Sequence, residues 1–286
     1  MLYLTIIFCF LFLLAGYKSV KSGNTIQLYP FDLQETLPLR GILAVCVFLN
    51  HLCAHLDHAS PWLVDFEMWG TPSVACFFLL AGYGLAFSVK AKGSSYLNGF
   101  FRKRLSKLIW PFVMMILINQ SYKIMCGTFS WNRMLLEPSP FSWFIYALLI
   151  WYVGFYICFK NSSSHKTSIV KVWLFTAVYM AVTIKLHLDY YWISILPMPM
   201  AITYVFYEEK AKNRIRLHPC LSLYVVGGMF VMVMGYTLYA IYVHHLPCWG
   251  PIVYNTLPVW VVFLTYMLGG AKNVITNFLG GSKRSF

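Results

Sequence analysis

The chain has 286 residues, of which 59% are hydrophobic and 11% are charged, and its formal net charge is +13 at pH 7. A soluble domain of this length could not hide so much apolar surface, so the composition excludes a soluble protein and indicates a polytopic membrane protein. The basic residues are scattered over short loops and tails instead of lying on one water-exposed face, which excludes nucleic-acid binding.

Nine hydrophobic segments have, or nearly have, the length needed to span a bilayer. They predict an all-α integral membrane protein, a helical bundle of about nine spanning segments that forms one domain over residues 1–286. In chain order the segments are 2–17, 39–56, 71–89, 108–126, 142–159, 169–187, 191–206, 219–243 and 251–270. The weakest are the first and 191–206, which is short and contains Pro197 and Pro199.

The first segment does not read as a secretory signal, because no basic residue precedes it and Lys18 and Lys21 follow it. Positive charge after the helix predicts that the N-terminus lies outside. This orientation places almost all of the 22 basic residues on the cytoplasmic side, and the exceptions are Lys123, Arg133 and Lys185. So strong a bias supports both the segment count and the orientation.

Arg40 and His51 lie in one apolar stretch of the second segment, with ten residues between them. Eleven helical steps nearly complete whole turns, so both side chains project from the same face, about 16 Å apart along the axis. Ionisable groups inside a membrane helix are functional-site candidates by default. His51 could be a core histidine that shares a polar contact with Asn50, but we favour catalysis, because an imidazole can accept a proton from a hydroxyl and return it.

A metal site is only weakly indicated. His51 and His55 are four residues apart and could form a pair of ligands, but nothing selects a third ligand among the polar residues expected on the outer side. Those residues are Asp57, Asp65, Glu67, His244 and His245. His55, Asp57 and His58 are more simply wetted interfacial residues. The eight cysteines occur singly, so they predict neither a zinc site nor a disulfide. We expect no metal.

Three further stretches follow in chain order. Small residues at Ala81, Gly82 and Gly84 favour close packing of another helix. The basic run from Arg102 to Lys107 has an ordinary interpretation as a positive-inside anchor, favoured on sequence alone, and a functional one as a phosphate site. In the functional interpretation Arg104 and Lys107, three residues apart, share a helix face and grip one phosphate group. The aromatic run 142–146 is typical of an interface anchor.

Taken together, these stretches resemble the membrane-bound acyltransferase 3 family, the bacterial O-acyltransferases that decorate cell-surface glycans. The matching elements run from Leu37 to His51, from Phe77 to Leu85, from Tyr96 to Pro111 and from Ser142 to Ile145. The arginine and histidine separated by ten residues, in order with the other elements, form a fairly specific pattern. The resemblance covers residues 37–160 well and is vague beyond them.

The resemblance implies about ten membrane helices in the bacterial inner membrane and an acyl-CoA donor, acetyl-CoA above all, taken from the cytosol. It also implies transfer of the acyl group to a hydroxyl of an extracytoplasmic glycan. By position, His51 resembles the essential histidine of the family and Arg40 its paired arginine. Arg104 and Lys107 resemble the basic pair in the loop between helices, where they would bind the donor.

The chain departs from the family pattern at three places. Ala81 stands where the family often has serine, so a hydroxyl role is lost there. The stretch from Asn277 to Phe286 looks like the start of the final family helix, which leads us to expect a truncated copy that lacks this helix. The helix expected at 2–17 lies outside the core family pattern.

The expected site extends along the Arg40–His51 face, where the pantetheine arm of the donor would lie. An acceptor vestibule would be lined by outer polar and aromatic residues, namely Asp57, His58, Trp62, Asp65, Glu67 and Trp69. The competing class is a non-enzymatic transporter of glycan or lipid. Inverted internal repeats would favour a transporter, and the sequence shows none. Acyl transfer to a lipid or peptide would use the same residues and stays open.

Overall fold

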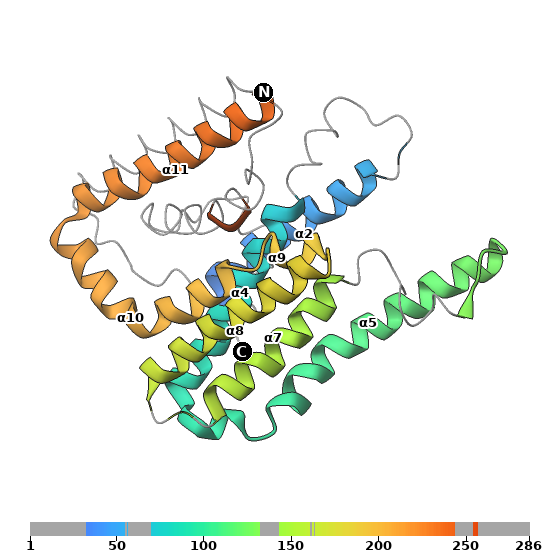
Figure 1. Cartoon of the computed structure of the whole chain (residues 1–286), viewed down its shortest axis with the longest axis horizontal. Helices are drawn as coiled ribbons and strands as arrows, with labels where there is room; N and C mark the ends of the chain where they lie inside the picture. Colours follow the sequence, from blue (N-terminus) through green and yellow to red (C-terminus); the bar gives the residue numbers. More distant parts are fainter. Residues whose placement is uncertain are drawn as a thin grey trace. The chain divides into compact units, whose positions relative to one another are not determined.

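The computed structural model describes residues 33–54, 56, 70–131, 143–160, 162, 164–243 and 254–256. Within these ranges every regular element is a helix (Figure 1), which confirms the all-α prediction. Four of the described helices are long and apolar enough to cross a bilayer. The segment 2–17 and most of 251–270 lie outside the described residues, so the number of nine spans stays a prediction.

The elements in chain order are α2 (Leu33–Ala54), α4 (Gly70–Lys92), the 3₁₀ turn η2 (Gly93–Leu97), α5 (Phe100–Met125), α7 (Trp143–Lys160), α8 (His165–Lys185), α9 (Asp189–Trp192), α10 (Pro197–Leu217) and α11 (Pro219–Val243). They fall into two compact units. The first unit holds the described residues up to Ala86 and those from Ile193 onward, and the second holds Phe87 to Trp192. Each unit is described by itself below.

The predicted continuous segment 191–206 is wrong. Helix α9 ends at Trp192, and α10 begins at Pro197, a residue that the first turn of a helix tolerates. The turn between them is held by Asn255, whose side chain accepts a hydrogen bond from the Leu196 N–H at 2.9 Å and donates one to the Ile193 carbonyl at 2.6 Å. Helix α10 then continues to residue 217, through the charged stretch that the sequence predicted to be a loop.

The first unit is built around the N-terminal part of α4. Phe78 and Ala75 of this helix are fully buried. Gly70 lies so close to α2 that a Cβ atom there would overlap the side chain of Asn50. A Cβ atom on Gly82 would lie 2.5 Å from the carbonyl oxygen of Met198 in α10. The predicted close packing at the small residues is therefore confirmed at Gly82.

The second unit is held together by aromatic rings on α7. Trp151 is buried and packs edge-on against Phe175 of α8, with ring centroids 5.2 Å apart. Gly154 leaves the space that the Phe175 ring occupies, since a Cβ atom at this position would overlap the ring. Near the start of α7, Trp143 lies 6.0 Å from the ring of Tyr190 in α9. Aromatic packing thus joins the start of α7 to α9.

The two glycines of α4 provide a test of this packing. We expect Gly82→Ala to destabilise the protein by about 1–3 kcal/mol, because the added methyl group meets the backbone of Met198. Gly84→Ala is the control, because a Cβ atom there meets nothing within 4 Å and alanine is the better helix former. Thermal unfolding in detergent measures both, and equal loss in the two variants would contradict the packing argument.

Candidate functional site

Arg40 and His51 lie on one uninterrupted helix, α2, as the sequence predicted. Their separation along the axis is about 16 Å at 1.5 Å per residue. Both side chains are half-buried. Leu43, one turn after Arg40, is buried, whereas Val45 and Phe48 are exposed, and Phe48 lies about one turn before His51. The two ionisable groups therefore lie at the edge of the packed side of α2, between buried and exposed side chains.

The Nε atom of Arg40 is buried and has no hydrogen-bond partner among the described residues. Buried polar atoms in native proteins nearly always have partners, so such an atom calls for an explanation. A guanidinium group with an unused N–H donor on a packed helix face is able to bind an anionic or carbonyl oxygen of a ligand.

The second predicted pair, Arg104 and Lys107, lines one cavity of about 700 Å³ in the second unit. Five of the nine lining residues carry a positive charge. The lining consists of Ser88, Lys92, Tyr96, Gly99, Arg102, Lys103, Arg104, Ser106 and Lys107. We call this cavity the basic pocket. It brings Arg104 and Lys107 together, as expected from their spacing.

The basic run lies on a helix, and the expectation of a loop between helices is wrong. Helix α5 begins at Phe100, so Arg104 and Lys107 occupy its first two turns. Gly99 immediately before it has a φ of 68°, a left-handed conformation in which glycine has no steric penalty. This residue turns the chain from η2 into α5, so that the last residues of α4, η2 and the start of α5 surround one cavity.

The positive charge of the basic pocket is not neutralised within the described part of its unit. The sequence contains no Asp or Glu between Glu67 and Glu137. The acidic residue of this unit that the structure describes is Asp189 in α9, which lies at the end of α7 where Trp143 meets Tyr190. The basic pocket lies near the other end of α7. Its cations are therefore available to an anionic ligand.

Arg104 is held by Tyr96. The Tyr96 hydroxyl oxygen accepts a hydrogen bond from Arg104 Nε at 2.8 Å and a second from Nη2. Lys103 is held more weakly, by a 3.4 Å hydrogen bond from its Nζ atom to the Asn98 carbonyl oxygen. Tyr96 lies within a sequence element that we expected to matter, but nothing in the spacing of eight residues indicated this pairing.

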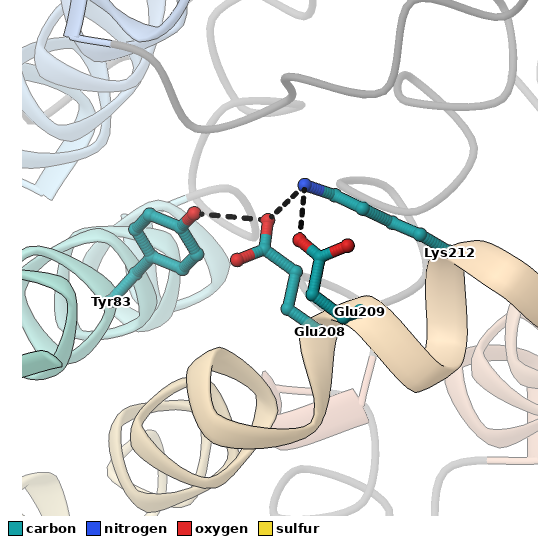
Figure 2. Close-up of polar contacts among 4 residues, drawn as sticks. All are labelled: Tyr83, Glu208, Glu209 and Lys212. Carbon is teal, nitrogen blue, oxygen red and sulfur yellow. Dashed lines mark hydrogen bonds and ion pairs between the residues drawn. The ribbon is translucent and has the colours of Figure 1, made fainter.

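A buried ion pair in the first unit was missed by the sequence analysis (Figure 2). Lys212 Nζ lies 2.9 Å from Glu208 Oε1, and both side chains are less than a tenth exposed. The Tyr83 hydroxyl of α4 donates to the same Glu208 oxygen at 3.2 Å. Glu209, which is mostly exposed, lies 3.6 Å from Lys212 Nζ. The spacing of four between Glu208 and Lys212 was the available signal for the ion pair, and the Tyr83 hydrogen bond to Glu208 ties α10 to α4.

The buried pair can be tested against its exposed neighbour. Glu208→Ala removes the buried carboxylate and leaves Lys212 only the more distant, mostly exposed Glu209 at 3.6 Å, so we expect it to destabilise the protein by about 3 kcal/mol. Glu209→Ala removes the second, mostly exposed partner of Lys212, and we expect a loss below about 1 kcal/mol because an exposed ion pair contributes little. The thermal unfolding midpoints in detergent compare the two, and a similar shift for both would show that burial of the pair is unimportant.

The two predicted pairs belong to different units: Arg40 and His51 to the first, Arg104 and Lys107 to the second. The two residues of each pair thus lie on a single helix, α2 for the first pair and α5 for the second. The residues predicted to line an acceptor vestibule, which run from Asp57 to Trp69, lie outside the described residues.

Comparison with known proteins places the chain in a family. Residues 39–282 match the family model of acyltransferase 3, described as an acyltransferase domain. The match covers well over half of the chain and includes all four predicted site residues. No curated protein and no solved structure matches the chain.

Proposed function

Because the chain belongs to the acyltransferase 3 family, whose membership implies an acyltransferase, we propose that it is a membrane O-acyltransferase that uses cytosolic acyl-CoA. The acyl group, acetyl in the first place, passes to a hydroxyl of an extracytoplasmic cell-surface or exported glycan. The protein lies in the bacterial inner membrane with its N-terminus outside. The observation that carries this proposal is the basic pocket, because a cavity with five cations suits the phosphate groups of coenzyme A.

In this proposal the donor binds with its phosphates in the basic pocket. Arg104 offers planar, bidentate hydrogen bonds to a phosphoryl group, and Lys107 adds a point charge on the same helix face. Seryl hydroxyls at Ser88 and Ser106 also line the cavity. The cytosolic face supplies coenzyme A, in keeping with the orientation that the basic residues predict.

The transfer step takes place at His51. The imidazole accepts the proton of the acceptor hydroxyl, and the hydroxyl oxygen attacks the thioester carbonyl carbon. The C–O bond forms as the C–S bond breaks, and the imidazolium returns its proton to the departing thiolate of coenzyme A. Arg40, on the same helix face with a buried N–H donor that has no partner among the described residues, contacts the donor on its path to His51.

The role of His51 is tested by acyl transfer from radiolabelled acetyl-CoA in membranes that contain the protein. We expect label in the glycan fraction and a loss of about 10²-fold or more in the His51→Ala variant, the usual range for removal of a general base. His218→Ala is the control, because this histidine is exposed at the end of α10. Equal transfer by the two variants would exclude the imidazole of His51 from catalysis.

The role of the basic pocket is tested by the Michaelis constant for acetyl-CoA. We expect Lys107→Ala to raise it about tenfold, the effect of one charge-assisted contact, with a smaller difference from wild type at high salt. Lys123→Ala removes the same charge near the other end of α5, and its Michaelis constant should match that of the wild type. If the two lysine variants behave alike, the donor phosphates do not bind in this pocket.

A further inference from the structure

We propose that Tyr96 is a positioning residue that orients Arg104 toward a phosphoryl group of the acyl donor. This inference rests on the proposed function, because it takes the basic pocket to be the site of the donor phosphates. It adds to that function the residue that prepares the pocket before the ligand arrives.

The geometry of the contact determines which donors of Arg104 remain available. A guanidinium group carries five N–H donors, and the Tyr96 hydroxyl accepts two of them, one from Nε and one from Nη2. The remaining donors are two on Nη1 and one on Nη2. These two nitrogens form the fork that binds two oxygens of one phosphoryl group. Tyr96 therefore binds the Nε–Nη2 edge of the guanidinium group and leaves the Nη1–Nη2 edge available for a phosphoryl group.

Tyr96 can hold Arg104 because its own ring is fixed. The ring packs edge-on against Phe100, with centroids 5.7 Å apart. Phe100 is fully buried and packs in turn against Tyr152 and Phe155 of α7, with centroid distances of 6.0 Å in both cases. The position of the Tyr96 hydroxyl is thus set by the aromatic packing between the start of α5 and α7.

An uncharged hydrogen-bond acceptor such as the Tyr96 hydroxyl can orient Arg104 without neutralising its charge. An unrestrained arginine loses much of its side-chain conformational freedom when a ligand immobilises it, and this loss weakens binding. Tyr96 restrains Arg104 before binding, yet it brings no negative charge that would weaken attraction to phosphate. A carboxylate at this place would orient Arg104 equally well and would neutralise it. The absence of Asp and Glu between residues 67 and 137 agrees with this requirement.

The test removes the hydroxyl oxygen alone. In purified protein held in neutral-lipid nanodiscs, we expect Tyr96→Phe to weaken coenzyme A binding about tenfold by calorimetry. In the transfer assay it should raise the Michaelis constant for acetyl-CoA and leave kcat unchanged. Tyr156→Phe is the matched control, since Tyr156 packs in the same aromatic cluster and its hydroxyl makes no hydrogen bond with the residues that the structure describes.

Two further measurements separate positioning from a general structural effect. With S-acetylpantetheine, a donor without phosphates, the Tyr96→Phe variant and the wild type should have equal kcat/KM. In an Arg104→Ala background, Tyr96→Phe should add little, because a positioning residue acts through its partner. A tenfold further loss in that background would overturn the inference.

The remaining outcomes distinguish this inference from the proposed function. If the wild type binds coenzyme A and Tyr96→Phe binds it equally well, the positioning role is wrong and the proposed function stands. If the wild type does not bind coenzyme A, the proposed function fails and this inference fails with it. Similar losses in Tyr96→Phe and Tyr156→Phe would show that the aromatic cluster matters only for stability, which also overturns the inference.

Discussion

The cost of leaving a charge without a partner in an apolar environment governs where this chain carries ionisable groups. Glu208 and Lys212 are buried, and each neutralises the other at 2.9 Å, with Tyr83 as a further donor to the carboxylate. The cations of the basic pocket lie instead around the start of α5, where they line a cavity of about 700 Å³. Arg40 and His51 lie between these cases, because they are half-buried at the edge of the packed side of α2. Ionisable groups at such a position in a membrane helix are candidates for chemistry.

The chain restrains its cationic side chains in two different ways. The difference distinguishes a cation with a structural role from one that is available to bind a ligand. Lys212 is paired with the carboxylate of Glu208 within α10, so its charge is neutralised, and the same carboxylate accepts the Tyr83 hydrogen bond that ties α10 to α4. Arg104 is held by the neutral hydroxyl of Tyr96, so its orientation is restricted while its charge stays available. Both arrangements restrict a long flexible side chain. We therefore read the first as a packing element and the second as part of a ligand site.

Several features follow from residue spacing alone. A helix turns by a constant angle for each residue, so spacing predicts that Arg40 and His51 share one face of α2, and that Arg104 and Lys107 share one face of α5. The small residues near Gly82 indicate close helix packing, because short side chains let another helix approach the backbone. The predicted ends of the helices were wrong where a helix end depends on contacts with residues distant in the sequence. Hydropathy placed the start of the fourth segment at 108, but α5 begins at Phe100, because this buried ring packs on α7.

The sequence by itself determined the membrane class, the helical content, the family resemblance and the relative direction of side chains within each helix. These properties depend on composition and on a local period, which no distant residue can change. Only the tertiary structure decided which side chains meet across helices. Tyr83 and Glu208 are separated by 125 residues, and Tyr96 reaches Arg104 because Gly99 turns the chain between them. The first pair depends on how α4 and α10 pack, and the second on the direction in which the backbone turns at Gly99. Residue spacing within one helix specifies neither.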